Sequence, residues 1–225
     1  LENYNENQKI NFPSMLSEQD AWWPPDRIIS DYGRLNRPRE SVLYLSNELT
    51  NAIYETRCKN EECFFVMVYN SRRQIRISQL HTVPYMKELT ELENAKRIIM
   101  HNFLINEFTK IVPEGRETEY MSSLIIYEEF FKNDDIDAFL YPSISSLRKT
   151  GYNIAFPIEK AKENLSLCGV MVFQLAGKGN DSEFSLVPYL DGFFDAKEGY
   201  SFYPFNSEIS REKFGSFTFI RDAGL

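Results

Sequence analysis

The chain has 225 residues, of which 43% are hydrophobic and 15% aromatic, so it can bury the core of one sizeable domain or at most two small ones. Its formal net charge of −8 argues against a nucleic-acid binder, because phosphate backbones require a basic surface. No apolar run approaches the ~20 residues of a membrane span. Three cysteines cannot build a disulfide framework, which favours a reducing compartment. We therefore expect a cytoplasmic globular protein that binds neither nucleic acid nor membranes.

The chain opens with the polar segment LENYNENQKI, which has no initiator Met and no signal peptide. We expect residues 1–225 to form a single domain that is a fragment of a longer chain and lacks upstream residues.

A metal site is disfavoured. Cys58 and Cys63 in CKNEEC have a spacing that would suit half a zinc site, but His81 and His101 stand alone and complete nothing. The favoured interpretation of CKNEEC is a helix end followed by the start of a strand. Two isolated histidines also give poor support to Ser-His-Asp chemistry. We expect no metal and no resident cofactor.

The predicted elements are strands near both ends of the chain with helices between them. In chain order we predict a strand over 41–45, a helix over 46–57, strands over 63–70 and 74–80, a helix over 85–110, a helix over 117–131, strands over 137–142 and 152–157, a short helix over 158–165, and strands over 168–176, 184–190 and 216–222. In the long helix the 3.6-residue period predicts that Leu89, Leu92, Ile99 and Phe103 face inward. This order indicates an α+β fold.

Several polar residues stand out around the first predicted strand and helix. Arg34 follows Gly33, where a tight backbone turn can bring a guanidinium close to phosphate or carboxylate. Tyr44 lies within the apolar strand, and Glu55 lies on the last turn of the helix, where the helix dipole disfavours a negative charge. Ser143 follows a proline that ends a later strand. Each feature alone is more often a surface charge, a core tyrosine or a turn serine.

Together these segments resemble the two signatures of the RES-domain family. GRLNRPRESVLYLSNELTNAIYE is similar to the first, G-R-x-N-P-x-G-x-x-x-L-Y-x-A followed by a helix ending in A-x-x-E. DAFLYPSISSLRKTGYNIAFP is similar to the second, D-G-x-x-Y-P-S followed by G-x-N-x-A-x-F, and EYMSSLIIYEEFF resembles the helix that precedes it. The order and spacing agree from Trp22 to Pro157.

The resemblance implies an ADP-ribosyltransferase-like mixed β core with a helical segment between the two signatures, and a bacterial toxin that consumes NAD⁺. It implies that NAD⁺ is a substrate and that a toxin–antitoxin or defence role fits the chain. The family's arginine, tyrosine, glutamate and serine fall on the residues singled out above. The same segments supply further candidate substrate-binding residues: Arg37, Tyr141 and Asn153.

This chain departs from the family pattern at three places. NRPRES replaces N-P-x-G, and Ala138 stands where a glycine is usual. A further family arginine, about 20 residues ahead of the Pro-Pro pair, falls at or before Leu1, and Arg27 follows that pair too late to replace it. We therefore expect part of the active site, or a regulatory region, to lie upstream.

The expected roles follow from the chemistry of the nicotinamide–ribose bond, whose cleavage builds positive charge on the ribose. A carboxylate at Glu55 stabilises that charge, Arg34 holds the pyrophosphate, and Tyr44 offers its ring to the nicotinamide cation. Ser143 is expected to bind a ribose hydroxyl, the amide or an incoming phosphate. An inorganic phosphate acceptor needs its own cationic seat, which either the missing upstream arginine or Arg37 could supply. The products are those of NAD⁺ phosphorolysis or hydrolysis. The alternatives are a protein mono-ADP-ribosyltransferase and a non-catalytic interaction domain. An antitoxin or an upstream inhibitory domain is the expected partner.

Overall fold

The computed structural model describes residues 17–56, 58–60, 62–80, 83, 85–143, 151–178 and 184–213. Its contacts divide the chain into two compact units. The first unit comprises Leu1–Trp23, Thr56–Arg72 and Leu165–Leu225, and the second comprises Pro24–Glu55 and Arg73–Asn164. Both units draw on segments that alternate along the chain, so no single cut in the sequence separates them. That one RES-like domain spans residues 1–225 stays a prediction.

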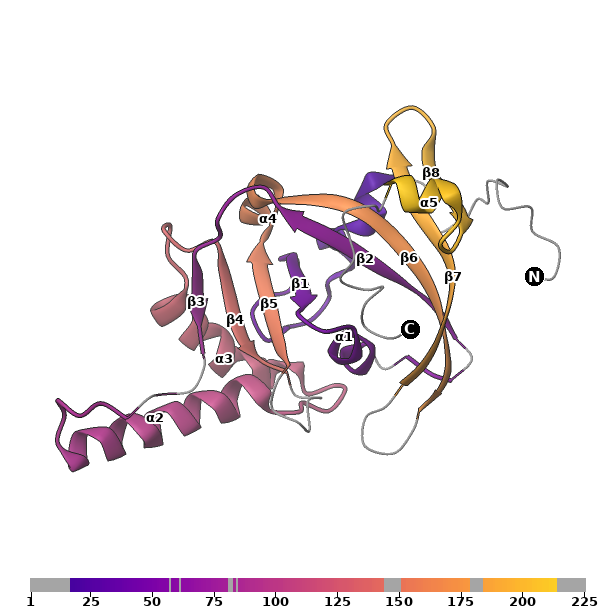
Figure 1. The fold of residues 1–225 in the computed structure, drawn as a ribbon. Coiled ribbons are helices and arrows are strands. Elements are labelled where there is room, and N and C mark those ends of the chain that lie inside the picture. Colours follow the sequence, from indigo (N-terminus) through magenta and orange to yellow (C-terminus); the bar gives the residue numbers. More distant parts are fainter. Residues whose placement is uncertain are drawn as a thin grey trace. The chain divides into compact units, whose positions relative to one another are not determined.

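The second unit is built on a four-stranded sheet in the order β1-β5-β4-β3. Its strands are β1 (Val42–Ser46), β3 (Ile77–Gln79), β4 (Ala138–Pro142) and β5 (Tyr152–Pro157), which lie side by side in Figure 1. β5 is antiparallel to both of its neighbours, whereas β3 and β4 are parallel. The sheet is therefore mixed, and it joins strands from the two signature segments directly.

Helical segments accompany this sheet. They are the 3₁₀ turn η2 (Asp26–Ile28), α1 (Leu49–Glu55), α2 (Glu91–Thr109), the continuous helical run η3 (Glu117–Tyr120), α3 (Met121–Ile126) and η4 (Tyr127–Phe131), and α4 (Ile158–Asn164). The run from 117 to 131 matches the predicted helix, although its pitch changes from 3₁₀ to α to π along its length.

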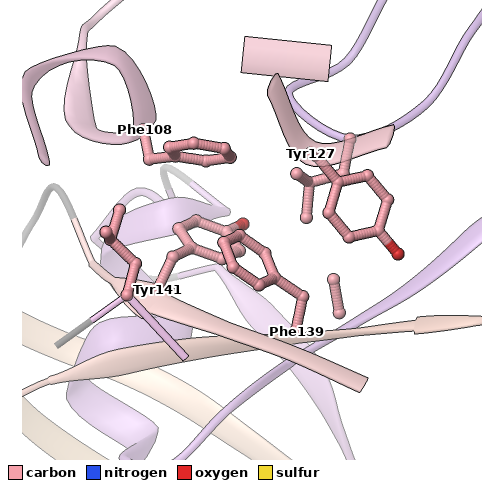
Figure 2. Close-up of a cluster of buried hydrophobic side chains, with 7 residues drawn as sticks. Phe108, Tyr127, Phe139 and Tyr141 are labelled. Atoms are coloured by element: carbon pink, nitrogen blue, oxygen red, sulfur yellow. The ribbon is translucent and has the colours of Figure 1, made fainter. Parts of the chain in front are cut away.

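An aromatic cluster joins the helices to the sheet. Figure 2 shows Phe108 of α2 and Tyr127 of η4 reaching towards Phe139 and Tyr141 of β4. The ring centroids of Phe108 and Phe139 lie 5.2 Å apart, and those of Tyr127 and Phe139 lie 5.3 Å apart. Burial raises the pKa of the Tyr127 phenol to about 12. The helices therefore pack on the same face of the sheet as the one that carries the candidate polar residues.

The prediction for the buried face of the long helix is wrong. Thr90 caps α2 through a capping box with Glu93, as the sequence allows. However, the exposed fractions of Leu92, Ile99 and Phe103 are 65%, 69% and 51%. The helix meets the core through its last turns, namely Leu104, Ile105 and Phe108. Apolar residues occur around the whole helix, so their period predicted a helix but not the face that is covered.

The first unit contains a second four-stranded sheet, antiparallel throughout, in the order β2-β6-β7-β8. Its elements are η1 (Glu18–Ala21), β2 (Cys63–Ser71), β6 (Leu165–Lys178), β7 (Phe184–Asp195), β8 (Gly199–Pro204) and α5 (Glu208–Lys213). Alternate residues of β6 pack into two different hydrophobic clusters. Val170 and Val172 pack with Phe202, and Met171 packs with Phe173. This period of two is the one expected of a strand.

The α+β class is confirmed. The strands predicted over 41–45, 63–70, 137–142, 152–157, 168–176 and 184–190 are present, with shifted ends in places, and the strand predicted over 74–80 shortens to β3. The helix predicted over 46–57 is the shorter α1, whereas β8 and α5 were not predicted. The predicted strand over 216–222, together with Arg57, His81 and the upstream segment before residue 17, lies outside the described residues. Over the described part of the chain, no helix combines the length and apolarity needed to cross a membrane.

Candidate functional site

The Glu55 carboxylate is held by residues from the second signature. Its Oε1 accepts hydrogen bonds from Ser143 Oγ at 2.8 Å and from Asn153 Nδ2 at 2.9 Å. Ser143 and Asn153 are buried, whereas Glu55 is exposed at the end of α1. The donors are 88 and 98 residues further along the chain than the acceptor. The fold thus positions a solvent-accessible carboxylate by two buried donors.

The sheet register explains why these residues meet. Tyr141 of β4 lies opposite Asn153 of β5, and Ser46 of β1 also lies opposite Asn153. Side chains alternate between the faces of a sheet, so Tyr44, Tyr141 and Asn153 share one face. The backbone N–H of Ser143 donates to the carbonyl of Gly151 at 3.0 Å, which continues the β4–β5 pairing beyond Pro142. The polar candidates therefore gather where β1 and β4 end.

Arg34 is a buried cation, and among the described residues no acidic side chain pairs with it. Its side chain is only 8% exposed, and its Nη2 donates to the carbonyl of Lys110 at 3.1 Å. The guanidinium carbon lies 5.1 Å from the ring centroid of Tyr120 and 6.0 Å from that of Tyr141. Among the described residues, Nη1 is buried and has no hydrogen-bond partner. A buried charge left in this state is costly, so the site is prepared for an anion.

Tyr141 connects the arginine and the carboxylate. Its phenol is buried, and desolvation raises its pKa well above the ordinary value, while Arg34 lowers that pKa and Glu55 raises it. Both charges therefore act on the same phenol. A hydrogen bond with Asn153 also lowers the pKa of Tyr141. The candidates from the two signatures belong to one electrostatic environment in the second unit.

Tyr44 presents its ring while its hydroxyl is engaged. The side chain is 41% exposed, but the hydroxyl donates to Asn36 Oδ1 at 3.0 Å and accepts from the Leu35 N–H at 3.3 Å. Desolvation of the hydroxyl, followed by the nearby phenol of Tyr141, raises the pKa of Tyr44 well above its ordinary value. The exposed part is therefore the ring, which suits a stacking role rather than acid–base chemistry.

Gly33 and Asn36 explain part of the first signature. A Cβ built at Gly33 would lie 2.1 Å from Asn36 Oδ1, the atom that accepts the Tyr44 hydrogen bond. Any side chain at position 33 would therefore displace Asn36. The glycine that we expected to permit a close backbone turn is needed here for the packing of this amide.

The turn after Asn36 has a backbone of the kind that glycine favours, although no glycine is present. Arg39 has a φ of 64°, and the Glu40 N–H donates to the Arg37 carbonyl at 3.1 Å. Proline before a residue of positive φ is the arrangement of a type II turn, in which that second position is usually glycine. Arg39 occupies the position of the glycine in N-P-x-G, so the changed residues still form the turn that such a glycine favours.

Arg37 is engaged in an ion pair. Its Nε and Nη2 donate to the two carboxylate oxygens of the partly buried Glu128 of η4 at 3.2 and 2.5 Å. This bidentate pairing raises the pKa of the Arg37 guanidinium. A phosphate would have to compete with Glu128, so a phosphate seat at Arg37 stays a prediction.

Sequence reasoning missed two buried polar residues of this unit. Asn51 lies one helical turn before Glu55, and Asp137, the first residue of DAFLYPS, has a fully buried side chain that pairs with Arg73. The sequence did contain a signal for Asn51, because its i, i+4 spacing places it on the same helix face as Glu55. Among the described residues, no group of three His, Cys, Asp or Glu side chains is arranged to hold a metal ion.

Comparisons of the chain with protein-family models, with curated proteins and with solved structures found no match.

Proposed function

We propose that this protein is a RES-type enzyme with an ADP-ribosyltransferase-like core, and that it cleaves the nicotinamide–ribose bond of NAD⁺. The observation that supports this most is the hydrogen-bonded set of Glu55, Ser143 and Asn153, since it unites residues from both signatures. A carboxylate fixed by two donors in this way is suited to stabilise a ribose cation.

The reaction breaks the bond between C1′ of the ribose and the ring nitrogen, and the bonding electrons leave with neutral nicotinamide. Positive charge develops on the ribose in the transition state, where the Glu55 carboxylate stabilises it. An oxygen of water or inorganic phosphate then bonds to C1′, and its proton is released to solvent. The products are nicotinamide and either ADP-ribose or its 1″-phosphate.

Arg34 supplies the binding of the pyrophosphate. The Arg34 side chain is buried, and among the described residues its Nη1 has no hydrogen-bond partner and no acidic side chain pairs with it. All three observations favour an anionic ligand at this position. A planar guanidinium can offer two parallel donors to phosphate oxygens. Binding there fixes the remote half of the substrate and so orients the ribose.

The exposed Tyr44 ring provides an aromatic face for the nicotinamide cation, a contact worth about 1–2 kcal/mol when it is desolvated. The positive φ of Arg39 also supports the proposal, because glycine favours such a backbone and the family pattern has a glycine at this position. A cytoplasmic toxin of this kind requires restraint, for which we propose an antitoxin or an upstream inhibitory domain.

The test is to incubate the full-length protein with NAD⁺, with and without inorganic phosphate, and to identify the products by chromatography. Released nicotinamide is the expected result, with a phosphorylated ADP-ribose only when phosphate is present if phosphate is the acceptor. ADP-ribose attached to a protein would instead identify a transferase. Unchanged NAD⁺ after long incubation would leave the non-catalytic interaction domain.

Arg34→Lys is expected to raise the KM for NAD⁺ by about 10- to 100-fold, the loss that corresponds to a charge-assisted hydrogen bond. Lysine keeps the charge but not the planar fork. Steady-state kinetics measure the change. Arg76→Lys is the matched control, because the Arg76 side chain is 59% exposed and, among the described residues, its ion pair is with the exposed Asp135 at 3.5 Å. An unaltered KM in Arg34→Lys would show that Arg34 does not bind the substrate.

A further inference from the structure

Asn51 carries a buried amide donor that the described part of the fold does not use. The residue lies in α1 and is only 3% exposed, and its Nδ2 has no hydrogen-bond partner among the described residues. Leaving such a donor unpaired costs free energy that a leucine of similar size would avoid. The position therefore has a cost in the unliganded protein that a bound acceptor oxygen would offset.

The place of Asn51 in the fold ties it to the Glu55 carboxylate. The two residues are four apart on α1 and so lie on the same helix face. Glu55 accepts a hydrogen bond from Asn153 of β5. Asn51 lies against Gly151, which comes two residues before Asn153 in the chain. A Cβ built at Gly151 would lie 1.7 Å from Asn51 Nδ2.

The same contact links Asn51 to Ser143. The carbonyl of Gly151 accepts from the Ser143 N–H, and the Ser143 hydroxyl donates to Glu55. Asn51, Gly151, Ser143 and Glu55 thus form a closed set of neighbours around the end of β4. A glycine at position 151 is what leaves room for the Asn51 amide beside this set.

We propose that Asn51 is a further substrate-binding residue of this site, and that its Nδ2 donates to an acceptor oxygen in the nicotinamide-riboside half of NAD⁺. This inference rests on the proposed function and extends it. The acceptor is either a ribose hydroxyl or the carboxamide oxygen, since both present a lone pair close to the bond that Glu55 acts on.

The test uses Asn51→Leu in the full-length protein, with Thr50→Ala, on an exposed position of the same helix, as the matched control. Leucine keeps the volume and removes the unpaired donor, so the melting temperature should be equal to or above that of the wild type. The KM for NAD⁺ and the dissociation constant measured by calorimetry should rise about 3- to 10-fold, the loss of one neutral hydrogen bond. Thr50→Ala should leave both unchanged.

A second ligand identifies the acceptor. ADP-ribose keeps the ribose but lacks nicotinamide, so weaker binding of both ligands by Asn51→Leu indicates a ribose hydroxyl. Weaker binding of NAD⁺ alone indicates the carboxamide. A lower melting temperature with unchanged affinity for both ligands would overturn the inference and make Asn51 a packing residue, while leaving the proposed function intact. Failure of the wild type to bind NAD⁺ would overturn both.

Discussion

Glu55→Gln is expected to fold as the wild type does and to lose about 10²–10³ in kcat, which corresponds to ~3–4 kcal/mol of transition-state stabilisation. Glutamine keeps an Oε1 that can accept from Ser143 and Asn153, so the two hydrogen bonds that hold the side chain are retained. What disappears is the negative charge, and with it the stabilisation of the ribose cation. Initial rates of nicotinamide release, together with a thermal melt, measure both parts.

Two further variants separate the charge from its surroundings. Ser143→Ala keeps the carboxylate and removes one donor to it, so we expect a smaller fall in kcat of about 3- to 10-fold. Glu48→Gln neutralises an exposed carboxylate just before α1 and is expected to have no effect on turnover. If Glu55→Gln stays within a few-fold of the wild type, Glu55 is only the last residue of a helix.

The part of the site that the sequence predicted is the part held by the sheet. Strands 137–142 and 152–157 have strong apolar patterns and a proline stop, and once they pair, Ser143 and Asn153 are brought to the same end. Glu55 reaches them because a short helix follows β1, which pairs with β5. The quoted signatures therefore identified residues that share an environment, although they are far apart in the chain.

Long-range contacts could not be predicted from the sequence. Arg37 pairs with Glu128, 91 residues away, and no local pattern indicates that partner, while phosphate binding by Arg37 stays a prediction. The apolar face of α2 was assigned inward, yet Ile99 is 69% exposed and Phe108 is fully buried. Periodicity describes a helix in isolation, whereas burial depends on the surface that it meets.

A second buried polar set supports the sheet at the opposite end of β4. The Asp137 side chain has no exposed surface and accepts from Arg73 Nη1 and Nη2 at 3.3 and 3.0 Å. It also accepts from the Arg76 N–H at 2.9 Å and from Asn164 Nδ2 at 3.4 Å. These bonds tie the segment before β3 and the end of α4 to the start of β4, at the aspartate of the D-G-x-x-Y-P-S pattern.

The ionised form of this aspartate is the one that the fold requires. Burial by itself raises the pKa of Asp137, but the Arg76 N–H and the Arg73 guanidinium outweigh it and hold the pKa below its ordinary value. A carboxyl whose pKa is lower in the folded state adds stability above its unfolded pKa of about 3.9. That contribution is lost as the pH falls through the lower, folded pKa.

Asp137→Asn is accordingly expected to lower the free energy of unfolding at pH 7 by about 2–4 kcal/mol, because it removes a buried charge from partners that remain in place. Asp135→Asn is the matched control: Asp135 is 88% exposed and meets Arg76 at 3.5 Å, so a change below ~0.5 kcal/mol is expected. Urea denaturation followed by circular dichroism gives both values.

Repeated at a series of pH values, the same measurement should show the wild type losing stability on acidification below about pH 4, with a smaller loss in Asp137→Asn. Equal slopes in the two proteins would mean that Asp137 is not the carboxylate whose protonation weakens the fold, and an unchanged free energy at pH 7 would mean that its buried bonds do not stabilise the sheet.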